Sequence, residues 1–268
     1  MAEEKMMDDQ TAQKKTSIGD DDDDDGDGPL DVELSNSALL LVDIQHDFVS
    51  DEGALAVGSA GEILATVYGL LDDEELGWKA DFHPPGHISF ASTHQAQPFT
   101  QLTTDLAGRS DGEPGGSSLE VQTRTIDLWP DHCVQGTKGS ELDGGIQERL
   151  ERLKSEGRTV KVIHKGIHPD VENYSAFLDD GADRLDEFLG SLGVRNVFVA
   201  GDFCVKACCE SALQAGLRVF WIRDGIRSVG GGSVQMGVEC ALAGAAAVQG
   251  GSFRVVRGGA GGVRGLLC

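Results

Sequence analysis

The stretch Ala38-Leu39-Leu40-Leu41-Val42-Asp43 decides the fold, because an unbroken apolar run ends there at a carboxylate. A short apolar run of this kind is typical of a strand that is buried on both faces, as strands are in a parallel sheet. The pattern predicts a strand over 38–43. Comparable runs predict further strands over 159–164, 196–200, 217–222 and 253–256.

Segments with apolar residues at three- and four-residue spacing lie between these runs. They predict helices over 59–71, 143–156, 182–191, 203–215 and 232–248. Strands that alternate with helices indicate an α/β protein, so we expect a three-layer α/β/α fold with a mostly parallel central sheet. Residues 96–127 are rich in Gly, Ser, Thr and Asp and predict a long loop.

The N-terminal segment is strongly acidic. Its first 33 residues hold thirteen Asp or Glu and three Lys, which gives −10 (3 minus 13) of the net charge of −23. It contains almost no aliphatic residues whose burial could offset the entropy of ordering. We therefore predict a disordered acidic tail over 1–34, which acts either as a solvated spacer or as an interaction tail, and one domain over 35–268.

The overall composition limits the class of partner. A net charge of −23 makes nucleic acid and anionic membranes poor partners. The chain has no run of about eighteen apolar residues, and acids stand where a signal peptide needs basic and then apolar residues. Six cysteines without such a signal indicate reduced thiols. We expect a protein of the cytoplasm or another soluble intracellular compartment. The composition leaves a homo-oligomer open.

A metal-binding pattern lies in the stretch Ala80-Asp81-Phe82-His83-Pro84-Pro85-Gly86-His87, with His132 farther along the chain. One carboxylate and two imidazoles are typical of a catalytic metal centre, since a closed structural site more often uses thiolates. We predict that Asp81, His83 and His132 bind one divalent metal ion. His87 is left open between a further ligand and a supporting residue. Zinc is the expected ion, with iron and manganese as alternatives.

Three further residues predict a catalytic group. Asp43, Lys165 and Cys204 each end or follow an apolar strand. The carboxyl ends of parallel strands meet at one edge, where α/β enzymes bind ligands, so the three side chains can converge. Cys204 lies at the start of the predicted helix 203–215, whose unpaired N–H groups and dipole favour a thiolate. Either Asp43 or Cys204 alone would more often be structural.

Taken together, these segments resemble the nicotinamidase branch of the isochorismatase-like cysteine hydrolases, from about Ser37 to Gly225. The motifs that carry the resemblance follow one another in family order: 38–48, 80–87, 128–137, 164–166 with 174–177, and 202–207. The resemblance implies an isochorismatase-like hydrolase fold. It also implies metal-dependent hydrolysis of nicotinamide to nicotinic acid and ammonia, a reaction of NAD salvage.

The resemblance further implies a role for each residue of the catalytic group. Cys204 would attack the amide carbon to give a thioester. Asp43 would take the thiol proton and return it to the leaving ammonia, and Lys165 would hold both groups in place.

A set of aromatic residues would bind the substrate ring. By resemblance, Phe48 and Trp129 pack on the ring faces, and Tyr174 lines the pocket. A metal ion that binds the pyridine nitrogen would turn the carboxamide toward the catalytic cysteine.

The chain departs from the family pattern in two places. Relatives carry a few more residues, including an oxyanion donor, between the preceding strand and the catalytic cysteine. In this chain only Ala200 to Phe203 separate Val199 from Cys204. Three alternatives follow: Ala200 or Gly201 supplies the donor, the oxyanion hole is damaged, or the gene model is faulty. In addition, the polar stretch 75–81 replaces the apolar strand that leads to the metal motif.

Two other functions compete with the nicotinamidase interpretation. The protein could be another isochorismatase-like amide or ureido hydrolase, although those branches generally lack this metal set. It could instead be a catalytically silent homologue that binds metal or nicotinamide, which the shortened segment before Cys204 would explain.

Overall fold

The computed structural model describes residues 30–72, 77–105, 123–177, 184–202, 204–227, 245–248 and 253–256. Its centre is a six-stranded sheet in which every described pairing is parallel. The strands lie in the order β6 (Val162–Lys165), β3 (Gly77–Asp81), β2 (Ser37–Val42), β7 (Asn196–Gly201), β8 (Arg218–Ile226) and β9 (Ala246–Val248). Strands β2 and β7 are buried along their whole length, as continuous apolar runs require.

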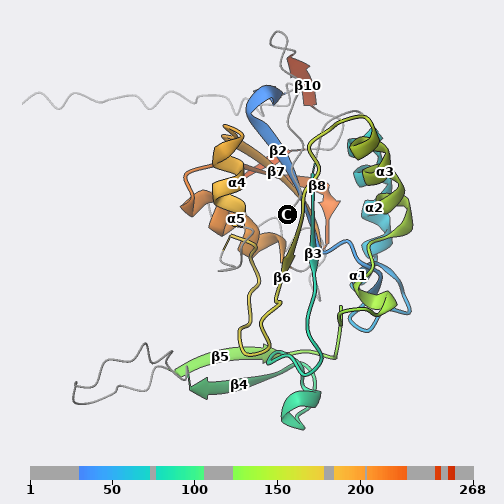
Figure 1. Cartoon of the computed structure of the whole chain (residues 1–268), viewed down its shortest axis with the longest axis vertical. Coiled ribbons are helices and arrows are strands. Elements are labelled where there is room, and N and C mark those ends of the chain that lie inside the picture. Colours follow the sequence, from blue (N-terminus) through green and yellow to red (C-terminus); the bar gives the residue numbers. More distant parts are fainter. Residues whose placement is uncertain are drawn as a thin grey trace, which may run out of the picture.

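Helices cover both faces of this sheet (Figure 1). On one side lie α2 (Ile63–Asp72) and α3 (Gly144–Ser155), and on the other lie α4 (Leu185–Ser191) and α5 (Val205–Gln214). The side chains of β2 alternate between the two cores, with Leu39 facing α2 and α3 and Leu40 facing α4 and α5. The predicted three-layer α/β/α fold is therefore confirmed.

The remaining helical segments are short. Helix α1 (His46–Val49) follows β2 directly. The single-turn 3₁₀ helices are η1 (Leu34–Asn36), η2 (Ala60–Glu62), η3 (Ser92–His94) and η4 (Lys138–Ser140). Helix α3 begins where it does because the carboxylate of Asp143 accepts hydrogen bonds from the backbone N–H groups of Gly145 and Ile146.

A hairpin below the sheet corrects one prediction. Strands β4 (Thr100–Asp105) and β5 (Thr123–Leu128) pair antiparallel, so the prediction of a long loop over 96–127 is wrong at both ends (Figure 1). Threonine favours strands, but most of the described side chains of β4 are exposed. Strand β5 buries Ile126 and Leu128 at alternate positions, and Leu102 of β4 packs against them, but this apolar period is too short to mark a strand in the sequence.

The predicted strand at the C-terminal end exists, but it lies outside the central sheet. Strand β10 (Phe253–Val256) pairs in parallel with β1 (Leu30–Glu33). The predicted tail included the residues of β1, whereas residues 1–29 lie outside the described residues, so the division into tail and domain stays a prediction.

The predicted helix 232–248 is wrong at its end. Residues 246–248 form β9 at the edge of the sheet, beside β8. Residues 232–244 lie outside the described residues. Within the described part of the chain, no helix has the length and apolar character needed to cross a membrane.

Candidate active site

Four neighbouring strands deliver the principal polar residues to one edge of the sheet. Lys165 ends β6, Asp81 ends β3, Asp43 follows β2 and Cys204 follows β7. All four residues are at most 3% exposed. Because these adjacent strands are parallel, their carboxyl ends meet at one edge and bring together residues that lie far apart in the chain.

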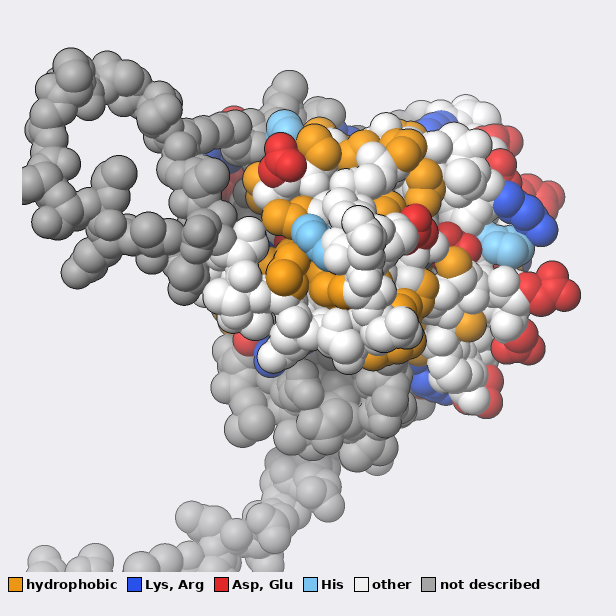
Figure 2. Space-filling model, turned by 90° about the horizontal axis from the view of Figure 1, so that it is seen from below, with side chains coloured by type: hydrophobic (Ala, Val, Ile, Leu, Met, Phe, Trp, Pro, Cys, Tyr) orange, Lys and Arg blue, Asp and Glu red, His pale blue; other side chains and the backbone are white. Residues whose placement is uncertain are grey.

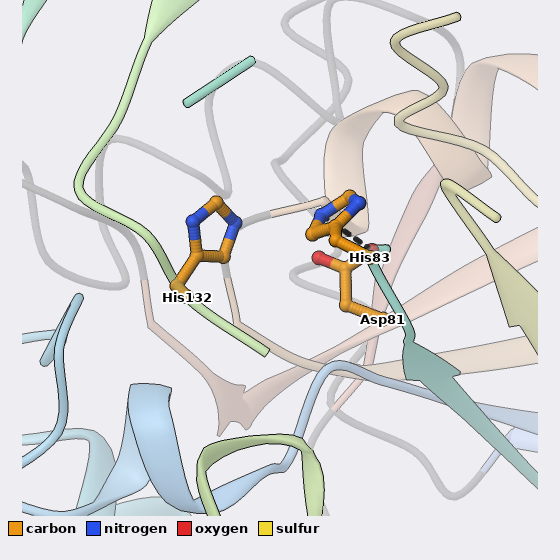
Figure 3. A group of neighbouring side chains, drawn as sticks. All are labelled: Asp81, His83 and His132. Atoms are coloured by element: carbon orange, nitrogen blue, oxygen red, sulfur yellow. Dashed lines mark ion pairs between the residues drawn. The ribbon is translucent and has the colours of Figure 1, made fainter. Parts of the chain in front are cut away.

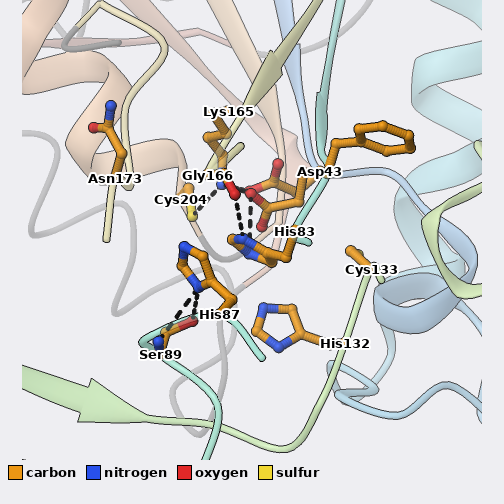
Figure 4. A network of polar contacts seen from close by, with 12 residues as sticks. Asp43, His83, His87, Ser89, His132, Cys133, Lys165, Gly166, Asn173 and Cys204 are labelled. Atoms are coloured by element: carbon orange, nitrogen blue, oxygen red, sulfur yellow. Dashed lines mark hydrogen bonds and ion pairs between the residues drawn. The ribbon is translucent and has the colours of Figure 1, made fainter. Parts of the chain in front are cut away.

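Lys165 lies at the centre of this group (Figure 4). Its Nζ atom lies 3.3 Å from Oδ2 of Asp43 and 3.2 Å from Sγ of Cys204, and it donates a hydrogen bond to Oδ1 of Asp81. A carboxylate oxygen of Asp43, one of Asp81 and the Cys204 sulfur all lie within 4.8 Å of one another. The structure thus brings together the three residues that were predicted to be catalytic.

Electrostatics set the charge states of this cluster. Burial alone would lower the pKa of Lys165, but Asp43 and Asp81 raise it well above its usual range, so the side chain is an ammonium. Burial and then Asp43 raise the pKa of Cys204 well above its usual range, and Lys165 offsets this only in part. Burial and Asp43 thus favour a resting thiol, and this agrees with the expectation that Asp43 takes the thiol proton.

The backbone is unusually tight beside Asp43. Asp43 has a φ of 56°, in the left-handed region that aspartate tolerates better than most residues. Gly201 has a φ of 132°, and a Cβ atom there would lie 1.9 Å from the carbonyl oxygen of Val42. Only glycine fits at this point, so β2 and β7 approach closely just before Asp43 and Cys204.

The predicted metal ligands Asp81, His83 and His132 form a second cluster (Figure 3). One ligand atom from each lies within 4.8 Å of the others, and Nε2 of His83 is 3.5 Å from Oδ1 of Asp81. Nδ1 of His83 lies 3.0 Å from the Gly166 carbonyl oxygen, and Nδ1 of His132 lies 2.8 Å from the Pro130 carbonyl oxygen. Such bonds fix the tautomer and leave Nε2 for a metal, so this donor set fits a divalent ion.

The ionisation of Asp81 and His132 also suits metal binding, whereas His83 favours its protonated form and would release a proton on binding a metal ion. Burial would raise the pKa of Asp81, but Lys165 and His83 hold it well below its usual range. Burial, with a contribution from His83, lowers the pKa of His132 to about 4. For His83, burial would lower the pKa, but Asp81 raises it overall. A carboxylate and a neutral imidazole are the forms that coordinate a metal.

His87 lies beside the ligands, and its ring centroid is 4.2 Å from that of His83. Both ring nitrogens have partners within the protein, since Nδ1 is 2.7 Å from Oγ of Ser89 and Nε2 is 3.1 Å from the Val171 carbonyl oxygen. Burial and repulsion from His83 lower its pKa to about 3. In this conformation both ring nitrogens face partners within the protein, and the ring packs on His83.

The predicted substrate-binding residues occupy two places. Phe48 is fully buried and packs edge-on against His132, with ring centroids 5.6 Å apart. Nε1 of Trp129 donates a hydrogen bond of 3.4 Å to the hydroxyl of Tyr174. Phe99 is 64% exposed and packs edge-on against Trp129 at 5.8 Å. Hydrophobic side chains also gather in the middle of the face that is seen from below in Figure 2.

Sequence reasoning missed several residues of the site. Glu172 is 5% exposed, and burial with a contribution from Asp81 raises its pKa. Phe90 is fully buried, with its ring edge-on to His83, His87 and His132. Phe90 lies three residues after His87, and this position close to the metal motif was the available signal in the sequence.

The shortened segment before Cys204 has its own hydrogen bonds. The N–H of Asp202 donates to the carbonyl of Val42 at 2.9 Å, and the N–H of Val205 donates to the carbonyl of Asp202 at 3.1 Å. These two donors are therefore engaged within the backbone. The described residues contain no cis peptide bond. Residue 203 lies outside them, so the source of the oxyanion donors stays a prediction.

Comparison with known proteins places the chain in a family. It is 36% identical over 203 residues to a nicotinamidase of Escherichia coli strain K12, in an alignment that covers 72% of this chain and 83% of the relative. The chain belongs to the nicotinamidase family. The resemblance inferred from the motifs, including the isochorismatase-like fold, is thereby confirmed. No model of a protein family matches the chain.

Two solved structures extend the comparison to the fold of the nicotinamidase family. The yeast nicotinamidase bound to the inhibitor nicotinaldehyde has a TM-score of 0.67 and 26% identity, and the match covers 80% of this chain and 99% of that one. The pyrazinamidase of Pyrococcus horikoshii in complex with zinc has a TM-score of 0.56 and 26% identity, with the same coverage.

Proposed function

We propose that this nicotinamidase family member hydrolyses nicotinamide to nicotinic acid and ammonia, with Cys204 as the nucleophile. One observation carries the proposal: the Cys204 thiol, the Lys165 ammonium and the Asp43 carboxylate are packed together beside a cluster of metal-binding type. The activity of the E. coli relative supports the substrate. The proposed reaction would serve NAD salvage.

The first half of the reaction begins with a proton transfer. Because Cys204 rests as a thiol, its proton passes to Asp43 as the sulfur attacks the amide carbon. The carbon–nitrogen bond then breaks, and Asp43 gives the proton to the departing ammonia. The product of this half is a thioester with Cys204.

In the second half, water attacks the thioester carbon and loses a proton to Asp43. The carbon–sulfur bond breaks, Cys204 regains its proton, and nicotinic acid leaves. Lys165 lies within 3.3 Å of both the base and the sulfur, so its positive charge stabilises negative charge on either one.

Asp81, His83 and His132 would hold one divalent metal ion. Such an ion would bind the pyridine nitrogen of the substrate and so orient the ring. The zinc complex of the Pyrococcus horikoshii relative favours zinc, and the donor set also accepts iron or manganese. Elemental analysis of the purified protein would identify the ion.

Trp129 and Tyr174 would bind the substrate ring. Their mutual hydrogen bond joins the end of the β5 hairpin to the segment that follows β6. The indole of Trp129 would stack on the substrate ring there. Phe48 contributes through its contact with His132, and its own contact with substrate stays a prediction.

Ammonia release from nicotinamide tests the proposal. Purified protein with added zinc, iron or manganese should release ammonia from nicotinamide. The Cys204→Ala variant should remain folded and release none. Cys209→Ala is the matched control, because it removes a fully buried thiol from the same helix and should retain activity. Mass spectrometry of the quenched reaction should detect an acyl group on Cys204.

Folded protein that releases no ammonia with any of the three metals would contradict the proposal. Nicotinamide binding without turnover, measured by calorimetry, would then favour the silent homologue. Turnover of a ureido compound in place of nicotinamide would favour another branch of the superfamily. The compartment, the oligomeric state and the role of the acidic tail stay predictions from the sequence.

A further inference from the structure

The segment that follows β2 carries three buried polar side chains at alternate positions. Asp43 and Gln45 are fully buried, and Asp47 is 9% exposed. Asp43 belongs to the catalytic cluster, whereas the proposed reaction leaves Gln45 and Asp47 without a role. Buried polar side chains are costly unless they form hydrogen bonds, so their partners indicate what they do.

Gln45 holds the backbone of Asp81 in both directions. Its Nε2 atom donates to the carbonyl of Asp81 at 2.6 Å, and its Oε1 atom accepts from the N–H of Asp81 at 2.6 Å. Nε2 also donates to the carbonyl of Ser140 at 3.0 Å. The side-chain amide therefore engages Asp81 as a neighbouring strand would.

The register of the sheet explains why this contact is needed. The described pairing of β2 with β3 consists of Leu40 with Gly77 and Leu41 with Trp78, so it ends three residues before Asp81. On its other side, Asp81 still pairs with Lys165 of β6. Gln45 thus replaces the missing β2 neighbour at the position of a metal ligand.

Asp47 holds the other metal-binding segment. Its Oδ2 atom accepts from the N–H of Cys133 at 2.7 Å, and its Oδ1 atom accepts from the N–H of Ala54 at 3.1 Å. Cys133 directly follows His132 and has a φ of 45°, in the left-handed region. A Cβ atom on Gly139 would lie 2.0 Å from Oδ2 of Asp47, so the loop closes tightly around this carboxylate.

We propose that Gln45 and Asp47 are positioning residues of the metal centre. Gln45 fixes Asp81, and Asp47 fixes the peptide between His132 and Cys133. One short segment thereby aligns ligands from two distant parts of the chain with Asp43. The inference rests on the proposed metal site, and it assigns a role to two residues outside the proposed ligand and catalytic sets.

A purely structural role would give a different result. Removal of any buried polar group that bonds to the backbone destabilises the fold, so loss of stability alone does not distinguish the two roles. Only positioning predicts a loss of metal affinity beyond the loss seen for an equally buried polar residue elsewhere. Supporting residues behind metal ligands typically change affinity by about 10- to 100-fold.

The test measures zinc affinity by chelator competition on metal-free, full-length protein. Gln45→Met, which keeps the shape and loses both bonds to Asp81, should weaken zinc binding by about 10- to 100-fold. Gln45→Glu keeps the acceptor for the Asp81 N–H and should give a smaller loss. Asp47→Asn keeps one carbonyl acceptor and should also give a smaller loss. These two milder variants keep the test open where Gln45→Met fails to fold.

Asn196 provides the matched control. It is 4% exposed, and its Nδ2 atom donates to Oδ1 of Asn36 at 2.6 Å, at the opposite end of β7 from the site. Asn196→Ala should lower the melting temperature and leave zinc affinity within about twofold, as distant sites act independently.

Two failures can be told apart. If the wild type binds zinc and releases ammonia but the Gln45 and Asp47 variants bind zinc equally well, the positioning role is wrong and the proposed function stands. If the folded wild type binds none of zinc, iron or manganese, the metal site itself is wrong.

Discussion

The ammonium group of Lys165 donates a hydrogen bond to Asp81 and so joins the catalytic cluster to the metal-binding cluster. The same nitrogen contacts Asp43 and Cys204. One cation is therefore shared by a candidate base, a candidate nucleophile and a candidate metal ligand. We therefore expect this single side chain to couple catalysis to metal binding.

Removal of the Lys165 cation should lower the stability of the fold. Lys165→Met leaves the Asp43 and Asp81 carboxylates buried without their cation, and this should lower the free energy of unfolding by about 3–5 kcal/mol. The control is Arg152→Met, because Arg152 pairs with Asp72 at the surface and should contribute less than about 1 kcal/mol. Urea denaturation of metal-free protein measures both, and similar losses in the two variants would contradict the coupling.

Metal binding should stabilise the protein through His132. Metal-free wild type with zinc at about 100 times its Kd should gain about 2.7 kcal/mol in the free energy of unfolding. His132→Ala should show no such gain. His94→Ala should keep it, because the imidazole of His94 bonds to the Ile88 carbonyl away from the cluster. Thermal shift with and without zinc gives the comparison, and a gain retained in His132→Ala would remove this residue from the ligand set.

Gly166 should resist substitution for a reason specific to the metal cluster. It has a φ of 64°, and a Cβ atom there would lie 2.2 Å from the ring of His83. Gly166→Ala should therefore weaken zinc binding in addition to its backbone cost. Gly157 has a φ of 80° with open space around it, so Gly157→Ala should cost only about 1–2 kcal/mol of stability. Equal zinc affinity in the two variants would count against the predicted clash.

The neutral imidazole of His87 should make the metal-free protein acid-sensitive. Its pKa is about 3 in the folded protein and about 6.5 when unfolded, so below pH 6.5 the unfolded state binds one more proton. This contribution to stability is present above pH 6.5 and is lost as the pH falls toward 3. Between pH 6 and 4, wild type should lose about 1.4 kcal/mol per pH unit more than His87→Gln. Denaturant titrations at several pH values test this, and parallel curves would contradict it.

Substrate binding should depend on the pair formed by Trp129 and Tyr174. Tyr174→Phe removes the acceptor of a long hydrogen bond and should raise KM for nicotinamide by about two- to fivefold with little change in kcat. Trp129→Leu removes the ring face and should raise KM by about tenfold or more. Steady-state kinetics distinguish these effects, and a fall in kcat alone would place the pair outside the substrate pocket.

The fold was predictable where burial is complete. Strands β2 and β7 are buried on both faces, and their unbroken apolar runs identify them directly. Strands β4 and β5 were missed because their apolar alternation is limited to Leu102, Ile126 and Leu128 among threonines and other polar residues. The alanine-rich run before Val248 fits a close-packed helix as well as an edge strand, so the sequence could not identify β9.

The site was predictable to the extent that side-chain type carries chemistry. The motifs named Asp43, Lys165 and Cys204, and the structure brings them into contact. Gln45 and Asp47 act on backbone groups, whose positions depend on the register of distant strands. No local pattern gives that register, so the supporting residues emerge only from the structure.

The order β6-β3-β2-β7 has a consequence for how the protein regains activity after unfolding. Each of these four adjacent strands delivers one member of the site, and no two members come from the same hairpin. Because their pairings join distant segments, formation of the site requires long-range closure, which is slow compared with local helix formation. On refolding, enzymatic activity would therefore return only when all four strands have paired. We expect this to happen later than the return of the helical signal.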